Sequence, residues 1–328
     1  MTLVIGTDEA GYGPNLGPLV VAATAWSIAA AAEDAEALLS DAMKEVDAVV
    51  ATRRGGTRTP LWADSKQIFR GGAGLCALEQ GVATGLLIAA GDLPVSWTAL
   101  ADSIGPITPR DGCRGEWQAL LPITMPLQAD AAECLALATV VRGVLARHGV
   151  SLEQIACRGI YPAEFNALLD TGMNKSDILS ATTLDLAATL RASTPNEPAI
   201  IWCDRHGGRK RYGGLVSHHF GAALVRPLEE TPDRSVYLVP ACDVTATNAC
   251  RIEFCVGGEA RAPVALASMT AKYVRELAMH GFNTFWSSRL PGLRPTAGYP
   301  SDALRWRRDA ATAIEQEQLA DAALWRRA

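Results

Sequence analysis

The chain opens with the run Val4-Ile5-Gly6-Thr7-Asp8-Glu9-Ala10-Gly11-Tyr12-Gly13-Pro14-Asn15-Leu16-Gly17-Pro18 and continues into an apolar segment at 19–23. The apolar, β-branched content of residues 3–7 predicts a strand. Two adjacent carboxylates stand where that run stops and a glycine-rich turn follows, so residues 18–27 are predicted to form a second, antiparallel strand. Acidic groups at a strand end, beside backbone that can approach a ligand closely, suit a hard divalent cation.

The acidic pair and the glycines also have other interpretations. Adjacent side chains on a regular strand point to opposite faces, so Asp8 and Glu9 reach one site only if the strand ends before them. Otherwise the pair is a polar turn. The spacing Gly11-x-Gly13-x-x-x-Gly17 differs from the dinucleotide-binding pattern GxGxxG, and an acidic pair stands where a phosphate would lie. We therefore reject a dinucleotide-binding loop and favour a metal site.

Further motifs follow in order along the chain. They are Ala63-Asp64-Ser65-Lys66, Asn174-Lys175-Ser176-Asp177-Ile178-Leu179-Ser180-Ala181-Thr182, Asp204 after the apolar run 199–203, Ala267-Ser268-Met269-Thr270-Ala271-Lys272-Tyr273-Val274-Arg275-Glu276, and Gly298-Tyr299-Pro300-Ser301. With the opening run they resemble the motifs of the type 2 ribonucleases H (ribonucleases HII and HIII), whose first strand ends in Asp-Glu-Ala-Gly-x-Gly-Pro. The matched motifs lie between residue 3 and about residue 305, and the chain between them is mostly unmatched.

This resemblance implies a fold, an activity and a set of site residues. The implied fold is α/β and ribonuclease H-like, with a mixed sheet of about five strands flanked by helices. The implied activity is metal-dependent endonucleolytic hydrolysis of the RNA strand of RNA–DNA hybrids, which leaves 5′-phosphate and 3′-hydroxyl ends. The implied catalytic and metal-binding residues are Asp8, Glu9, Asp204 and Glu276. Carboxylate-only sites favour Mg²⁺ or Mn²⁺. Two ions about 4 Å apart fit a scheme in which one activates water and the other stabilises the leaving 3′ oxygen.

Asp204 and Glu276 have plainer alternatives. Asp204 ends the apolar run 199–203, which predicts a buried central strand, and open α/β sheets place their sites at the carboxyl ends of such strands. Otherwise Asp204 caps a helix or lies in a loop. Glu276 shares a helix face with Ser268 and Lys272, so it is either a fourth metal ligand or the solvated partner of Lys272. The family usually has the shorter aspartate at this position.

The resemblance also implies substrate-binding residues, which are Gly11, Tyr12, Gly13, Lys66, Lys272 and Tyr299. Tyr12 departs from ribonuclease HII, which usually has arginine between these two glycines. A tyrosine supplies no guanidinium, but it can stack on a base or bond to a 2′-hydroxyl group, and the backbone N–H groups of the turn remain available. We therefore expect cleavage of longer hybrid runs more than cleavage at a single embedded ribonucleotide. The two lysines and Tyr299 are otherwise ordinary surface side chains.

The composition is that of a globular protein, with 328 residues, of which 49% are hydrophobic and 20% charged. A net charge of −5 gives no overall basic footprint, so nucleic acid would need a local basic groove, such as the cationic segment 205–211. The eight cysteines form no CxxC pair, which predicts buried thiols rather than zinc ligands. Neither a signal peptide nor a membrane-spanning run is evident, so we expect a cytoplasmic protein without a membrane partner. The sequence does not specify protein partners.

We expect one catalytic domain over residues 1–328, without an additional N-terminal domain. The matched motifs imply insertions near 28–60, 94–128 and 205–262 and a C-terminal helical part at 263–328. Helices are predicted at 28–50, 74–91, 129–148, 177–193, 263–278 and 302–327, and further strands at 235–239 and 251–256.

Two other functions stay open from the sequence. One is a nucleic-acid-binding protein of ribonuclease H-like fold with weak or lost cleavage, which Tyr12, Glu276 and the acidic net charge favour. The other is a nuclease that acts on a different structured nucleic acid. Loss of metal-dependent cleavage in an Asp8→Asn variant distinguishes the first from a nuclease, and a panel of substrates identifies the second.

Overall fold

The computed structural model describes residues 1–327 except 57–58, 71–73, 110–122 and 242–247. Its strands are β1 (Thr2–Ala10), β2 (Leu19–Ile28), β3 (Val150–Ile160), β4 (Ala199–Asp204), β5 (Arg226–Glu230), β6 (Arg234–Val239) and β7 (Cys250–Cys255). Its helices are α1 (Ala32–Arg53), α2 (Ser65–Arg70), α3 (Gly74–Ala90), α4 (Trp97–Ile104), α6 (Ala131–Arg147), α7 (Pro162–Asp170), α8 (Lys175–Ala192), α9 (Gly213–His219), α10 (Ala262–Arg289), α11 (Pro300–Asp309), α12 (Ala311–Gln316) and α13 (Asp321–Leu324), with a 3₁₀ turn, η1 (Gly258–Ala260), before α10.

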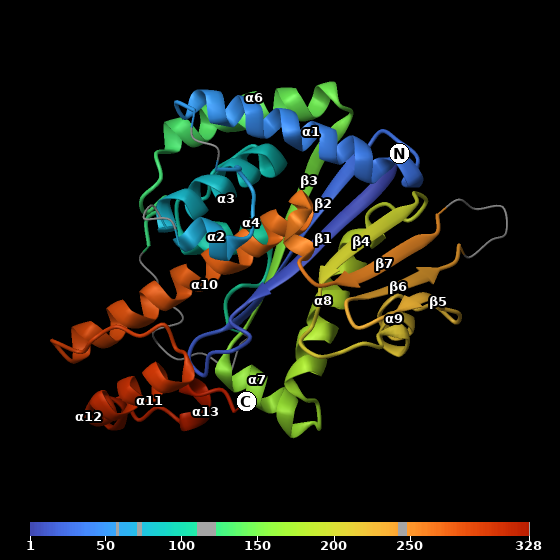
Figure 1. The fold of residues 1–328 in the computed structure, drawn as a ribbon. Coiled ribbons are helices and arrows are strands. Elements are labelled where there is room, and N and C mark those ends of the chain that lie inside the picture. Colours follow the sequence, from blue (N-terminus) through green and yellow to red (C-terminus); the bar gives the residue numbers. More distant parts are fainter. Residues whose placement is uncertain (57–58, 71–73, 110–122, 242–247, 328) are drawn as a thin grey trace.

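The strands of the described residues form one mixed sheet in the order β3-β2-β1-β4-β7-β6-β5 (Figure 1). Strand β1 is antiparallel to β2 and parallel to β4, and β4 is parallel to β7. The predicted α/β class, a mixed sheet flanked by helices, is confirmed. The predicted number of about five strands is wrong, because β5 and β6 extend the sheet to seven.

Strand β1 is central because both of its faces are apolar. Val4 packs into a core beneath α1, α3, α6 and α10, whereas Leu3 and Ile5 pack into a second core against α8 and α9. Figure 1 shows these two layers of helices on opposite faces of the sheet. A third apolar cluster joins the end of α10 to α11, α12 and α13 through Trp286, Trp306 and other side chains. The C-terminal helices are therefore anchored to the body of the molecule.

The first strand is longer than predicted, and this matters for the site. It continues through Asp8 and Glu9 to Ala10, and all three pair with β2. Its pairing with β4, however, ends at Thr7, which lies opposite Cys203. The expectation that the strand ends before Asp8 is therefore wrong, because β1 stays paired with β2 as far as Ala10. The other edge of β1, which pairs with β4, is unpaired beyond Thr7.

Most predicted helices form, with shifted ends. Helix α8 begins two residues earlier than predicted because Asn174 caps it in a reciprocal capping box with Asp177. Helix α10 has Pro263 in its first turn and runs on to Arg289, beyond the predicted end at residue 278. Part of the predicted insertion at 94–128 lies outside the described residues.

The cysteines that the structure describes agree with the prediction of buried thiols. Cys134, Cys157, Cys203, Cys250 and Cys255 are buried and free, and Cys76 is half-buried. Cys113 and Cys242 lie outside the described residues. None of the helices described here has the combination of length and apolar character that spanning a bilayer requires.

Candidate metal centre

Three carboxylates meet at the open edge beyond Thr7. Asp8 and Glu9 extend from β1, and Asp204 is the last residue of the adjacent parallel strand β4. One oxygen from each carboxylate lies within 4.8 Å of the other two. The parallel register explains the meeting of Asp8 with Asp204, because each follows the last β1–β4 pair, Thr7 with Cys203. Asp8 also accepts a hydrogen bond from the N–H of Glu9 (2.7 Å), which directs its carboxylate along the chain.

Burial and mutual repulsion favour the protonated forms of these acids. The side chain of Asp8 is only 7% exposed, and burial, followed by the charges of Glu9 and Asp204, raises its pKa well above the ordinary value. Burial and the charge of Asp204 raise the pKa of Glu9 to about 7. Burial, with further repulsion from Glu259, raises the pKa of Asp204 to about 6. A cation bound among these carboxylates would relieve this repulsion.

Glu259 is a fourth acidic residue at this edge, and the sequence analysis missed it. It lies in η1, and its charge raises the pKa of Asp8, Glu9 and Asp204. The preceding residue, Gly258, donates its N–H to Asp204 Oδ1 at 3.3 Å. The rule that identified Asp204 applies here as well, because η1 follows β7, whose carboxyl end lies at the same edge as that of β4.

The structure does not bring Glu276, the predicted fourth ligand, together with the three clustered carboxylates. Glu276 Oε1 lies 2.6 Å from Lys272 Nζ, so the plainer interpretation of an i, i+4 pair describes it. Helix α10 contributes Ser268 to the site instead. The Ser268 hydroxyl hydrogen-bonds the Asp8 carboxylate and lies 3.1 Å from Ser65 Oγ at the start of α2.

The two predicted lysines have different surroundings. Lys66 Nζ lies 3.9 Å from Glu259 Oε1, and the Lys66 side chain is 72% exposed at the rim of the site. Burial opposes its charge, but Glu259 and the other nearby carboxylates outweigh that effect and raise its pKa. Lys272 pairs with Glu276, and its Nζ lies 4.7 Å from the centroid of the Phe69 ring. Only Lys66 therefore faces the carboxylates.

The predicted glycine turn lies directly after these carboxylates. Gly11 has φ +87°, and a Cβ there would lie 2.5 Å from the Pro18 carbonyl oxygen, so the position requires glycine. Gly13 faces Tyr299, because a Cβ at Gly13 would lie 3.7 Å from Tyr299 Cε1. Tyr299 is 52% exposed. The turn and Tyr299 thus form one surface beside the acidic group.

Tyr12 has a cation above its ring that the sequence analysis did not single out. Lys175 Nζ, from the first turn of α8, lies 4.6 Å from the ring centroid of Tyr12. The half-buried phenol of Tyr12 has a raised pKa, because burial and the charge of Glu9 disfavour its ionised form. Tyr12 therefore stays a neutral hydrogen-bonding group beside an ammonium.

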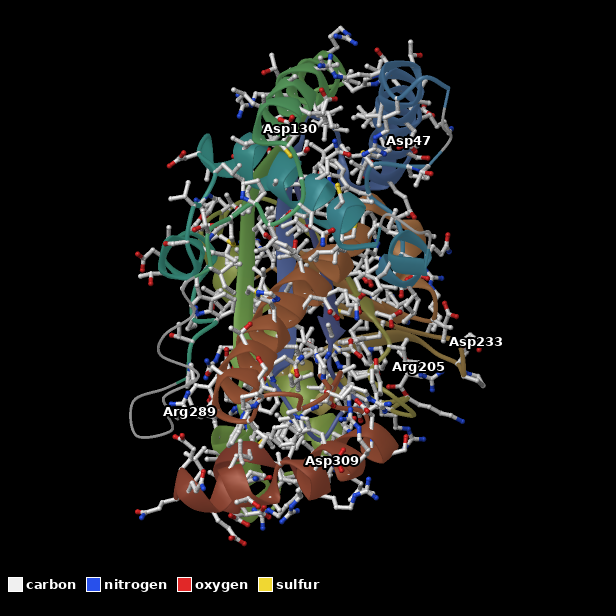
Figure 2. The ribbon with its side chains drawn as sticks, turned by 90° about the vertical axis from the view of Figure 1, so that its left-hand side faces the viewer. Asp47, Asp130, Arg205, Asp233, Arg289 and Asp309 are labelled. Atoms are coloured by element: carbon white, nitrogen blue, oxygen red, sulfur yellow. The ribbon has the colours of Figure 1, made fainter. Side chains whose placement is uncertain are left out.

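Much of the cationic segment 205–211 is engaged within the protein. Arg205 Nε donates to the Arg209 carbonyl at 3.1 Å, and Arg209 pairs with Asp177. Lys210 and Arg211 remain exposed. Figure 2 shows Arg205 on the same side of the molecule as Asp233, with Arg289 on the opposite side.

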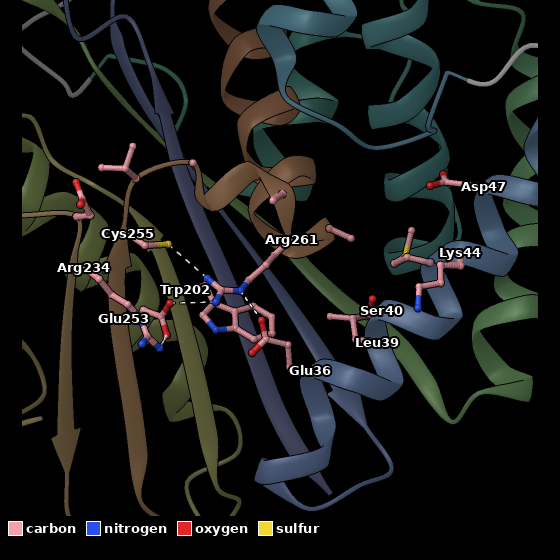
Figure 3. A pocket seen from close by; sticks show the side chains of 16 residues that line it. Glu36, Leu39, Ser40, Lys44, Asp47, Trp202, Arg234, Glu253, Cys255 and Arg261 are labelled. Atoms are coloured by element: carbon pink, nitrogen blue, oxygen red, sulfur yellow. Dashed lines mark hydrogen bonds and ion pairs between the residues drawn. The ribbon is translucent and has the colours of Figure 1, made fainter. Parts of the chain in front are cut away.

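A separate pocket of about 710 Å³ lies between α1 and the ends of β4 and β7 (Figure 3). The Arg261 guanidinium lies 4.9 Å from the Trp202 ring centroid and bonds to Glu36 (2.8 Å) and Glu253 (3.0 Å). The three clustered carboxylates do not line this pocket, although Gly257 and Ala260, which flank Gly258 and Glu259, do.

No protein-family model matches the chain. No curated protein matches it either. Among solved structures, the chain is similar in fold to a chain in the PCNA:RNase HII complex from Archaeoglobus fulgidus (14% identity, 98% of this chain and 93% of that chain, TM-score 0.43). It is also similar to the ribonuclease H2 from Pyrococcus horikoshii OT3 (15%, 98% and 92%, 0.44) and to Bst-RNase HIII in complex with Mn²⁺ (15%, 99% and 66%, 0.43). At such identities and TM-scores, we rest the functional proposal on the residues of this chain.

Proposed function

We propose that this chain is a metal-dependent endonuclease that hydrolyses the RNA strand of RNA–DNA hybrids. The observation that supports it best is the meeting of Asp8, Glu9 and Asp204 at adjacent strand ends, beside a turn whose glycine backbone can approach a phosphate. The motif resemblance to type 2 ribonucleases H supports the choice of nucleic acid.

The residues present fit a hard divalent cation. All three donors are carboxylates, which suit Mg²⁺ or Mn²⁺ better than zinc or copper. Burial and mutual repulsion make the ionised forms of these acids unfavourable, as their raised pKa values show, and a bound cation would offset that cost. We propose Asp8, Glu9 and Asp204 as the ligands, with Glu259 rather than Glu276 as the fourth acidic residue and two ions in total. When bound, such ions would activate water and neutralise the charge that develops on the phosphodiester.

The protein's own groups hold the acids in place. Ser268 and the N–H of Glu9 fix the Asp8 carboxylate, and the N–H of Gly258 fixes Asp204. These hydrogen bonds come from residues within β1, η1 and α10, so the group is organised before substrate arrives. Lys66 at the rim offers an exposed cation to a phosphate next to the site.

Substrate recognition follows from the turn and its aromatic neighbours. The backbone N–H groups of Gly11, Tyr12 and Gly13 suit a phosphate, and the exposed ring of Tyr299 suits stacking on a sugar or base. The neutral Tyr12 hydroxyl suits a 2′-hydroxyl group, which distinguishes RNA from DNA. Lys272 is the least suited of the predicted substrate residues, because Glu276 already neutralises its charge.

A panel of labelled duplexes tests the proposal. The purified protein and Asp8→Asn are incubated with Mg²⁺ or Mn²⁺ and an RNA–DNA hybrid, a DNA duplex with one ribonucleotide, plain DNA or plain RNA. We expect cleavage of the hybrid with 5′-phosphate ends, lost in Asp8→Asn and in chelator. Binding without cleavage would replace the proposal with a nucleic-acid-binding role. Cleavage of another substrate alone would replace the hybrid as substrate.

A further inference from the structure

We propose that Arg326, at the end of the chain, is a positioning residue that holds the turn Gly11–Pro14 in its substrate-binding conformation. The structural part of this inference stands on contacts within the chain. Its consequence for substrate rests on the function proposed above. Arg326 lies 315 residues from Gly11 in sequence, yet its guanidinium is completely buried beneath the turn.

The guanidinium holds the turn by two carbonyl groups. Arg326 Nη2 donates to the carbonyl oxygen of Gly11 at 2.5 Å and to that of Pro14. A trans peptide points its C=O and the following N–H in opposite directions. Fixing the Gly11 carbonyl toward buried Arg326 therefore directs the Tyr12 N–H away from the interior, to the side where a phosphate can approach.

The backbone delivers Arg326 to this place. Trp325 forms an antiparallel bridge with Leu16, and the Arg326 N–H donates to the Asn15 carbonyl at 2.8 Å. Asn15 Nδ2 in turn donates to the Arg326 carbonyl at 3.0 Å. On the other side, Asn166 Nδ2 donates to the Trp325 carbonyl at 2.7 Å. This pairing fixes the last residues against the turn, so the arginine loses little further freedom when it bonds to the carbonyls.

The charge of Arg326 lacks a matching anion in the described part of the chain. Its Nε and Nη1 atoms are buried there without hydrogen-bond partners. Its charged neighbour is a second buried cation, Arg275, whose Nε would lie 2.6 Å from a Cβ at Gly11. Burial and this repulsion lower the pKa of Arg326 to about 9, which still leaves it charged at neutral pH. Unpaired buried charge is costly, and an anion on the outer side of the turn offsets that cost.

These observations explain how a turn with tyrosine at its centre can attract phosphate. The positive charge comes from beneath the backbone, from Arg326 and Arg275, and from Lys175 above the Tyr12 ring. The neutral tyrosine side chain is then free to contact sugar or base. Arg326 therefore supports the substrate-binding turn from beneath without itself being exposed to substrate.

The first test is structural and needs no activity. Amide hydrogen exchange is measured for peptides covering residues 10–18 in the full-length protein and in Arg326→Gln, Arg326→Lys and Arg327→Gln. Arg327 is the matched control, since it anchors the same segment to α7, through Asp170 (2.6 Å) and Asn166 (2.7 Å), with a side chain that is 54% exposed. We expect about tenfold faster exchange of the turn in Arg326→Gln, an intermediate rate in Arg326→Lys, and no change in Arg327→Gln. Equal exchange in the Arg326 variants and Arg327→Gln would refute the positioning role.

The second test measures hydrolysis of an RNA–DNA hybrid with Mn²⁺. We expect Arg326→Gln to raise KM about tenfold with kcat within about threefold of the parent, and Arg327→Gln to change neither by more than about twofold. If Arg326→Gln does not fold by circular dichroism, Arg326→Lys is judged instead, with a smaller rise in KM expected. A loosened turn with unchanged KM would refute the role in substrate binding. A parent protein that cleaves nothing would refute the proposed function and leave the exchange result as the test of positioning.

Discussion

At the scale of single residues, the acidic group owes its properties to where the fold places ordinary carboxyl groups. Asp8 and Glu9 are adjacent in sequence, and Asp204 is brought beside them by the parallel pairing of β1 with β4. Burial then makes three negative charges unfavourable in the absence of a cation. Removing one of those charges should therefore stabilise the metal-free protein while abolishing its function, a trade between stability and activity.

The pH dependence of stability tests whether repulsion among the three carboxylates destabilises the metal-free protein. A carboxyl group whose pKa is raised in the folded state contributes stability below its unfolded pKa and loses it as pH rises through the folded pKa. For Glu9 this window runs from 4.5 to about 7, and for Asp204 from 3.8 to about 6. In chelator above pH 7, we expect Asp8→Asn to unfold about 2–4 °C higher than the parent, which corresponds to about 1 kcal/mol. Calorimetry against pH measures this, and a variant less stable than the parent throughout would be inconsistent with repulsion.

The two candidate fourth carboxylates are distinguished by a matched pair of substitutions. Glu259 acts electrostatically on all three acids, whereas Glu276 pairs with Lys272. We expect Glu259→Gln to lower kcat for the hybrid about a hundredfold and Glu276→Gln to lower it less than about threefold. Steady-state cleavage rates at saturating Mn²⁺ give both values, and the reverse order would restore Glu276 to the site.

Much of this site could be predicted from the sequence, and the omissions have physical causes. Asp8, Glu9 and Asp204 follow apolar runs that predict strands, so their meeting follows from topology. Glu259 follows such a run as well. The fourth ligand was nevertheless predicted at Glu276, because Glu276 lies within a motif that resembles the family. The contacts of Arg326 with Gly11 and Pro14 span more than 300 residues, and no local pattern predicts them.

At the scale of elements, strand periodicity explains which parts of the sheet were predicted. Strand β4 is apolar up to its last residue, Asp204, and was predicted, whereas β3 (Val150–Ile160) and β5 (Arg226–Glu230) were not. In β3 the adjacent exposed residues Glu153 and Gln154, beside a shift in its register with β2, break the alternation that would predict a strand, and β5 lies at the sheet edge and is mostly exposed. Their pairing with β2 and β6, rather than their own apolar content, makes them strands.

The β6–β7–α10 junction is stabilised by a buried acid whose removal should destabilise the fold. Glu253, on β7, is 2% exposed and bonds to Arg234 (2.8 Å) and Arg261 (3.0 Å). We expect Glu253→Gln to lower the free energy of unfolding by about 1.5–3 kcal/mol, because the buried side chain loses its charge-assisted hydrogen bonds to two partly exposed guanidinium groups, which keep Glu229 and Glu36 as partners. Asp41→Asn is the control, since the Lys44–Asp41 pair is exposed and its loss should change the stability little. Urea unfolding measures both, and equal effects would show that the arginines do not depend on Glu253.

At the scale of the whole molecule, an acidic chain is proposed to bind a polyanion through local rather than overall charge. The net charge is −5, and the buried carboxylates contribute to that figure until cations are bound. Among the described residues, the cations proposed to act at the site are Lys66 at the rim, Lys175 above Tyr12, and Arg326 and Arg275 beneath the turn. Residues near the two ends of the chain, Gly11–Pro14 and Arg326, thus meet beside the acidic group.

The most direct test of the central claim is a titration of the protein with Mn²⁺, followed by calorimetry, beside Asp8→Asn. The account predicts saturable binding to the parent protein, weakened by about tenfold or more in the variant because a ligand and its charge are lost. Folding is checked in parallel by circular dichroism. A parent protein that binds no Mn²⁺, or a folded variant that binds it as tightly as the parent, would show that Asp8, Glu9 and Asp204 do not form a metal centre.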